Sequence, residues 1–480
     1  MRNWQKQMMA LAALTLWTVS TRAAEVVASL DKTKTKITAK PKSTAKPAVK
    51  NKAAAVRRVF TRRLPPTPPV SVATRKEAQE GVVEKVASGQ QFPFENSRAL
   101  VPLFEQLYRH QSGELPGSIH LLHYGDSHAA ADELTGGLRE HFQQAFGDGG
   151  PGYSYAGRPW NSYRRLDVRS SSTHGWYSNG LVGRTGDGMY GLGGVAMSAM
   201  RPHEAVTLDA EGQSFELYYL RQPGGGQIAI FDNGMMVERV DTSGETAPAY
   251  FPYNAEYGPH KLEVKTLDSA PVRLFGWTAE KATGVTYETL GINGAEAQMM
   301  LGWNETVLRS NIEHRNPALI VLAFGTNEAG RRDLTLESYR EQFVRIVARL
   351  REAAPAASIL IVGPPDREIY ARTPATRKSN WVEMDSMDMV IEAQRQAALA
   401  SGCAFWDQRE KMGGKGAMNQ WVQAGFAQYD HVHFTVPGYH MLADAIYRDL
   451  MTEYAVFLKA RESMARAAPP VAAKTVAEPQ

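Results

Sequence analysis

Polar side chains that could carry out an acyl transfer follow three apolar segments of the chain. The first is Ser127, in Gly125-Asp126-Ser127-His128, directly after the apolar segment 118–124 and before a predicted helix. A serine in a tight turn projects from the backbone, and its own N–H lies at the positive end of the helix. That position suits a nucleophile whose attack creates an oxyanion. It also suits an ordinary helix N-cap.

The other two groups are Asn327 in Gly325-Thr326-Asn327-Glu328 and the pair Asp430 and His433 in Asp430-His431-Val432-His433. An asparagine N–H₂ can donate to a developing oxyanion. An aspartate three residues before a histidine can accept from its Nδ1–H and leave Nε2 free to take a serine proton. Taken singly, each motif also fits an ordinary turn or helix entry.

The elements that must position these side chains alternate between strands and helices. Apolar runs predict buried strands, and stripes at helical spacing predict helices. This alternation indicates an α/β fold with a parallel sheet covered on both faces and a site at the carboxyl ends of its strands. The predicted strands are 118–124, 318–324, 358–362 and 403–406, and the predicted helices are 134–145, 339–350, 384–400 and 437–454.

Residues 150–285 have a different character. Glycines are frequent there, and short strand-like runs replace the helical pattern. Asp232-Asn233-Gly234 between two such runs is a strong hairpin signal. The spacing predicts an inserted β-sandwich domain. Its predicted strands are 215–220, 227–231, 236–240, 261–266 and 271–277.

The composition excludes several classes of protein. With 480 residues, 43% hydrophobic and 22% charged, the chain is not wholly disordered, a coiled coil or a polytopic membrane protein. The net charge of +4 hides an asymmetry, since residues 1–75 carry +14 and residues 76–480 carry −10. An acidic body gives no support for nucleic-acid binding. The single cysteine, Cys403, excludes an internal disulfide.

The two ends of the chain predict segments outside the folded body. Residues 1–23 combine Arg2 and Lys6 with an apolar run and indicate an export signal, cleaved or kept as an anchor, which places the protein in the periplasm or cell envelope. Residues 24–92 are rich in Lys, Ala and Pro and predict a disordered linker that either contacts anionic envelope polymers or lipids or acts as a solubilising tether. Residues 463–480 predict a disordered tail.

The order Gly-Asp-Ser, Gly-x-Asn and Asp-x-x-His, each beside an α/β element, resembles the blocks of the SGNH (GDSL) hydrolase family. The resemblance implies a flavodoxin-like three-layer sandwich that needs no cofactor. It implies Ser127 as nucleophile, His433 as general base and Asp430 as its orienting carboxylate. The implied oxyanion hole consists of the Ser127 N–H, the Gly294 N–H and the Asn327 side chain. The sequence departs from the family pattern at His128 and Glu328.

A closer similarity is to exported bacterial peptidoglycan O-acetylesterases, carried by residues 123–128 and the glycine-rich 146–152. A carbohydrate-binding-like β domain is similarly inserted in those enzymes. The resemblance implies hydrolase segments 93–149 and 286–462 around the insert 150–285. It implies a serine esterase that removes O-acetyl groups from an envelope glycan, with O-acetylated peptidoglycan favoured and an exopolysaccharide as the substitute.

The same residues fit three alternatives. A sugar hydroxyl could replace water as the acceptor, which would make the protein an O-acetyltransferase. The chain could instead bind envelope glycans without catalysis, through aromatic side chains of the insert. A hydrolytic zinc site is disfavoured because no HExxH-type spacing occurs, and we predict no metal. The histidines and aspartates that would build such a site are His123, Asp126, His128, Asp132, His431, His433 and His440.

Overall fold

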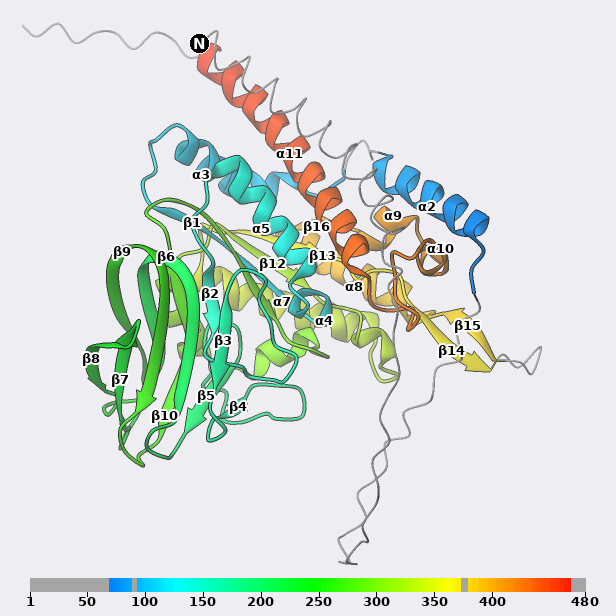
Figure 1. The fold of residues 1–480 in the computed structure, drawn as a ribbon. Coiled ribbons are helices and arrows are strands. Elements are labelled where there is room, and N and C mark those ends of the chain that lie inside the picture. Colours follow the sequence, from blue (N-terminus) through cyan, green and yellow to red (C-terminus); the bar gives the residue numbers. More distant parts are fainter. Residues whose placement is uncertain (1–68, 89–92, 373–378, 468–480) are drawn as a thin grey trace, which may run out of the picture. The chain divides into compact units, whose positions relative to one another are not determined.

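The computed structural model describes residues 69–88, 93–372 and 379–467 (Figure 1). The described residues from Ala73 onward belong to one compact unit. The predicted export signal and most of the predicted linker lie outside the described residues. Within the described ranges, none of the helices has the length and apolar character needed to cross a membrane.

A five-stranded parallel sheet forms the centre of the α/β part. Its strand order is β11-β1-β12-β13-β16, which is the flavodoxin-like order 2-1-3-4-5 when the strands are numbered along the chain. The strands are nearly continuous apolar runs because both faces of the sheet are covered. Their bounds are β1 Ser118–Gly125, β11 Gly284–Gly291, β12 Leu319–Ala323, β13 Ser358–Val362 and β16 Ala404–Trp406.

Helices cover the two faces of this sheet in separate groups (Figure 1). The helices α3, α5 and α11 contact one another on one face, while α6, α7 and α8 form the layer on the other. The predicted apolar stripe of α7 is buried against the sheet, and the α/β fold class is confirmed. The helices are α3 Val101–Gln111, α5 Glu133–Phe146, α6 Glu305–Arg315, α7 Leu336–Ala353, α8 Ser386–Ala400 and α11 Val436–Ala467.

Shorter elements occupy the connections between these layers. They include the turn of helix that begins at Ser127 and a small antiparallel hairpin, β14–β15. Their bounds are η1 Ser97–Leu100, α4 Ser127–Ala130, η2 Ala297–Gly302, η3 Glu328–Gly330, β14 Glu368–Arg372, β15 Ser379–Glu383, α9 Gln408–Met412 and α10 Ala417–Ala424.

The insert is an antiparallel sheet of nine strands, and the chain enters it after Phe146 and leaves it before Gly284. The two long strands β6 and β9 pair with each other along most of their length, and neighbouring residues of β6 pack into two different apolar clusters, with Leu217 and Tyr219 in one and Tyr218 and Leu220 in the other. Asn233 and Gly234 have positive φ at the predicted hairpin. The strands are β2 Gly152–Tyr155, β3 Arg169–Ser172, β4 Tyr177–Asn179, β5 Ala196–Ala199, β6 Ala205–Arg221, β7 Gln227–Asp232, β8 Met235–Asp241, β9 Ala247–Thr266 and β10 Val272–Glu280.

The predictions for the two ends of the chain need correction. Within the predicted linker 24–92, residues Val72–Ala87 form helix α2. Val82 and Val86, four residues apart, are buried, and the Gln79 side chain donates to the Ala424 carbonyl. This buried stripe is short, and the charged residues around it gave the segment a linker-like composition. Helix α11 similarly extends to Ala467, into the predicted tail 463–480.

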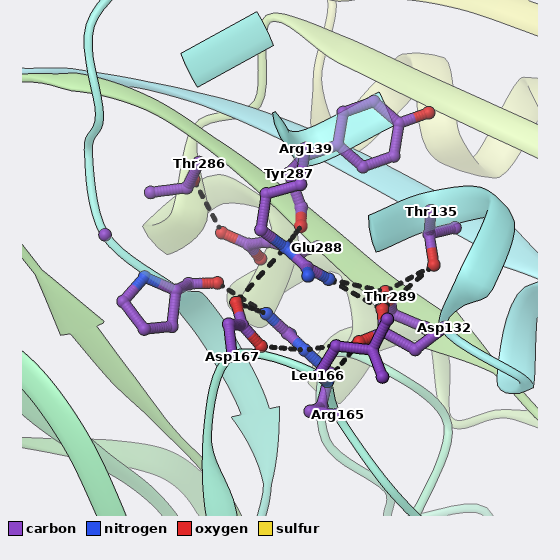
Figure 2. A network of polar contacts seen from close by, with 12 residues as sticks. Asp132, Thr135, Arg139, Arg165, Leu166, Asp167, Thr286, Tyr287, Glu288 and Thr289 are labelled. Atoms are coloured by element: carbon purple, nitrogen blue, oxygen red, sulfur yellow. Dashed lines mark hydrogen bonds and ion pairs between the residues drawn. The ribbon is translucent and has the colours of Figure 1, made fainter. Parts of the chain in front are cut away.

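A cluster of buried charges joins the insert to the α/β part (Figure 2). Asp132, before α5, is fully buried and accepts from Arg139 of α5 at 2.6 Å. Its second oxygen accepts from the Leu166 N–H of the insert at 2.7 Å. Arg165 of the insert pairs with Asp167 at 2.7 Å and lies 3.7 Å from Asp132. Burial alone would raise the pKa of Asp132, but the two arginines hold it at about 2.

Asp132→Asn should therefore destabilise the protein strongly. Asparagine tolerates the positive φ of 58° at this position, so the change removes charge without adding backbone strain. The buried guanidinium groups of Arg139 and Arg165 lose one of the two carboxylates that they share, and the free energy of unfolding should fall by about 3–5 kcal/mol. Urea unfolding measures this loss. Arg309→Ala, which breaks an exposed pair with Glu352, is the control and should change stability by less than about 1 kcal/mol; equal effects of the two variants would contradict the prediction.

Candidate active site

The carboxyl ends of three adjacent strands meet beside Ser127. β1 is paired with β11 and β12, and Gly125 lies opposite both Gly291 and Ala323. The loops that follow these strands carry Ser127, Gly294 and Asn327. The parallel register thus brings the three predicted oxyanion donors to one edge of the sheet, as expected for a site in an open α/β fold.

Ser127, His433 and Asp430 form a continuous chain of hydrogen bonds. The Nδ1 of His433 lies 2.7 Å from Oδ2 of Asp430, and its Nε2 lies 2.9 Å from the Ser127 hydroxyl. Because the carboxylate can only accept, Nδ1 carries the proton and Nε2 accepts from Ser127. The other Asp430 oxygen accepts from the Val432 and His433 N–H groups at 3.0 and 2.9 Å. This arrangement can remove a proton from a serine hydroxyl.

The electrostatics favour a charged Asp430 and a basic His433. The hydrogen bond to Asp430 raises the pKa of His433 above its usual 6.5. Partial burial would raise the pKa of Asp430, but the hydrogen bonds from His433 and from backbone N–H groups lower it to about 2. The carboxylate therefore stays ionised at neutral pH and stabilises the imidazolium that forms when His433 takes a proton.

The residues on either side of Ser127 are structural supports of the loop. Asp126 is buried and its Oδ1 accepts from the His128 N–H at 2.9 Å, the geometry of a helix N-cap. His128 is also buried, with Nδ1 3.1 Å from the Tyr439 hydroxyl and its ring 5.3 Å from that of His433. Burial lowers the pKa of His128 to about 3. His128 is therefore a neutral packing residue behind His433.

The predicted oxyanion donors have free hydrogen-bonding capacity. Among the described residues, the N–H groups of Ser127 and Gly294 have no acceptor. Gly294 has a φ of +75°, which favours glycine at this turn. The Asn327 side chain donates one N–H to the Ala295 carbonyl at 2.9 Å, which leaves its second N–H for another acceptor. The loops of Gly294 and Asn327 are thus in direct contact.

A pocket of about 450 Å³ opens beside Ser127 and His433. Ser162 and Arg164 of the insert line this pocket. No sequence motif predicts their place there, because they are far along the chain from His433 and only the fold brings them together. Arg164 pairs with the buried Glu133 at the start of α5. The remaining lining residues come mainly from the loops after Ser127 and around His433: Ala130, Ala131, Asn293, Gln428, Phe434, Thr435, Val436 and Tyr439.

The histidines and acids considered for a metal site have other partners. His123 is buried with Nδ1 2.9 Å from the Tyr287 hydroxyl, and His431 lies 2.5 Å from Glu368. Across the ranges that the structure describes, no three His, Cys, Asp or Glu side chains come together to hold a metal ion. Cys403 is buried, and burial raises the pKa of its thiol to about 11, so it is a poor nucleophile.

Part of the chain matches a known family. Residues 257–441 match the GDSL-like Lipase/Acylhydrolase family. The matched residues include Gly294, Asn327, Asp430 and His433, and the match supports an acylhydrolase, as the SGNH (GDSL) resemblance implied. The comparison with curated proteins gave no match.

Among solved structures, the chain is similar to a peptidoglycan O-acetylesterase, with 25% identity over 76% of this chain and 97% of that chain and a TM-score of 0.61. Two family two carbohydrate esterases also match. The enzyme from Clostridium thermocellum has 11% identity, covers 54% and 95% of the two chains and has a TM-score of 0.26. The enzyme from Cellvibrio japonicus has 10% identity, covers 61% and 99% and has a TM-score of 0.25. These two likenesses are too distant to support a conclusion.

The two neighbouring histidines should titrate differently. His433 should gain its proton above pH 6.5, because Asp430 stabilises the imidazolium, whereas His128 should stay neutral down to about pH 3. NMR of the imidazole carbons measures both. In Asp430→Asn the pKa of His433 should fall, since the stabilising charge is gone, while His128, whose pKa the same charge also raises, should stay neutral above pH 3. A common titration of both rings near pH 6.5 would disprove this assignment.

Proposed function

We propose that the protein is a serine esterase that removes O-acetyl groups from an envelope glycan, with O-acetylated peptidoglycan as the favoured substrate. The observation that carries the proposal is the hydrogen-bonded chain Ser127–His433–Asp430 at the edge of a pocket of about 450 Å³. An acetyl group fills only a small part of this volume, which leaves room for the sugar. The similarity to a peptidoglycan O-acetylesterase supports the choice of substrate.

In the first half of the reaction, Ser127 Oγ attacks the acetyl carbonyl while Nε2 of His433 takes the hydroxyl proton. The carbonyl oxygen becomes negatively charged and accepts hydrogen bonds from the Ser127 and Gly294 N–H groups and from the Asn327 side chain. Each donor of this kind stabilises the transition state by about 3 kcal/mol. His433 then donates the proton to the departing sugar oxygen, and acetyl-Ser127 remains.

In the second half, a water molecule attacks the acetyl-serine with His433 as base. One proton of the water passes to His433, and the bond between the acetyl carbon and Ser127 Oγ breaks. His433 returns that proton to Oγ, so the Ser127 hydroxyl is restored and acetic acid leaves, which ionises to acetate at neutral pH. Asp430 keeps its negative charge throughout and stabilises the imidazolium in both halves.

The location of the enzyme is part of the proposal. A segment with the pattern of an export signal, followed by strongly basic residues up to Arg75, fits an enzyme that works in the periplasm or cell envelope. The basic segment is suited to contact with anionic envelope polymers or lipid head groups. Fractionation of cells that express the full chain tests this location.

Ser127→Ala should abolish acetate release. Loss of the nucleophile should lower kcat at least about a thousandfold while leaving the fold intact, because the side chain is small and partly exposed. Acetate release from O-acetylated peptidoglycan, from acetylated xylan and from p-nitrophenyl acetate measures the effect.

Cys403→Ala is the matched control and should keep the rate, since the thiol is buried in the core. A Ser127→Ala variant with near-native rate would refute the assignment. Wild-type protein that transfers acetyl groups to de-O-acetylated glycan with little release of acetate would instead indicate an O-acetyltransferase.

Arg164→Ala should weaken the binding of the glycan substrate but not that of a small acetate ester. Arg164 comes from the insert, lines the pocket and pairs with Glu133 through Nη2, so its other N–H groups can donate to a sugar that enters the pocket. Loss of a charged hydrogen-bond donor should raise KM for acetylated glycan roughly tenfold. KM for p-nitrophenyl acetate should hardly change. Arg158→Ala, an exposed arginine of the insert, is the control; equal losses on both substrates would argue against a sugar-binding role.

A further inference from the structure

Glu328 is a buried carboxylate with three hydrogen-bond donors around it. It follows Asn327 directly and is 1% exposed. Its Oε2 accepts from the Gly325 N–H at 3.0 Å. Its Oε1 accepts from the Ala297 N–H at 2.7 Å and from the Tyr339 hydroxyl at 2.9 Å. Glu328 departs from the family pattern, and these three hydrogen bonds connect it to neither Ser127, His433 nor Asp430.

These contacts connect the two loops that carry the proposed oxyanion donors. Ala297 lies three residues after Gly294, and Gly325 lies two residues before Asn327. One carboxylate therefore holds both loops at the same time. The bond from Asn327 to the Ala295 carbonyl joins the same loops a second time. The separation of Gly294 from Asn327 is thus set by two contacts, and Glu328 makes one of them.

Both side-chain oxygens of residue 328 must accept hydrogen bonds, because donors face each of them. A glutamine would turn one end of its carboxamide, an N–H₂ group, towards a backbone N–H or the Tyr339 hydroxyl. One buried donor would then lose its acceptor, and the loop would shift to relieve the contact. An aspartate keeps both acceptors but is one methylene shorter. The charge is costly to bury, since burial raises the pKa of Glu328 to about 7.

We propose that Glu328 is the positioning residue of the oxyanion hole. It touches neither the substrate nor the reacting atoms, and it acts by fixing the Gly294 N–H and the Asn327 side chain at the spacing that the tetrahedral oxyanion requires. The proposal rests on the proposed esterase function.

The test is Glu328→Gln beside Glu328→Asp, assayed with p-nitrophenyl acetate. Misplaced donors weaken the transition state more than substrate binding, so kcat of E328Q should fall on the order of 100-fold with KM nearly unchanged. E328D should recover part of the loss. Inactivation by diethyl p-nitrophenyl phosphate, whose phosphoryl oxygen occupies the oxyanion position, should slow in parallel with kcat.

Glu296→Gln is the matched control. Glu296 lies in the same loop as Ala297 but pairs with Arg331 at its partly exposed side chain, so E296Q should keep the wild-type kcat. Urea unfolding and circular dichroism identify any variant that has lost its fold. Should E328Q not fold, E328D carries the test, with an expected loss of about tenfold.

The outcomes separate this inference from the proposed function. An inactive wild-type protein would refute the esterase function itself. An active wild type with E328Q and E328D within twofold of E296Q would overturn the role of Glu328 alone. Equal losses of kcat in E328Q and E296Q, or a loss that appears only in KM, would also overturn it, because a general disturbance of the loop would then suffice.

Discussion

The register of β1 between β11 and β12 determines where every loop of the candidate site can lie. Gly125 faces Gly291 on one side and Ala323 on the other, so three chain segments leave the sheet at the same height. A shift of one residue on either side would move Gly294 or Asn327 by about 3.3 Å relative to Ser127. That displacement exceeds the tolerance of an oxyanion contact. Glu328 and the Asn327 to Ala295 bond then set the fine spacing that the sheet alone leaves open.

The candidate site also depends on the buried charges around Asp132, which hold the insert in place. The cluster around Asp132 holds residues 165–167 of the insert against α5. Arg164, the residue directly before this segment, lines the pocket beside Ser127. The antiparallel sheet is therefore more than an appended domain. Its position relative to the parallel sheet sets the part of the pocket wall that Ser162 and Arg164 form.

Most regular elements of the α/β part could be predicted because burial on both faces gives continuous apolar runs. Strand β13 spans 358–362, as predicted. Strand β9 was predicted only over 261–266, although it spans Ala247–Thr266. Its first thirteen residues contain three prolines, which fit because β6 pairs with one side of β9 there and no described strand pairs with the other side. Ser127, Asp430 and His433 could be predicted because each belongs to a sequence motif. The place of Arg164 in the pocket and the contact of Glu328 with the Ala297 N–H could not, because only tertiary packing brings these loops together.

The insertion also has a consequence for the order of folding. β1 is synthesised long before its partners β11 and β12, and residues 126–283 must be arranged before the β1–β11 pair can close. Closing so long a loop is entropically unfavourable and slow when the chain between is unfolded. In the folded insert, however, Gly152 of β2 is paired with Ala279 of β10, which leaves the two ends about one strand spacing apart. If the insert folds first, the effective loop between β1 and β11 is short, and β11 can pair with the edge of β1.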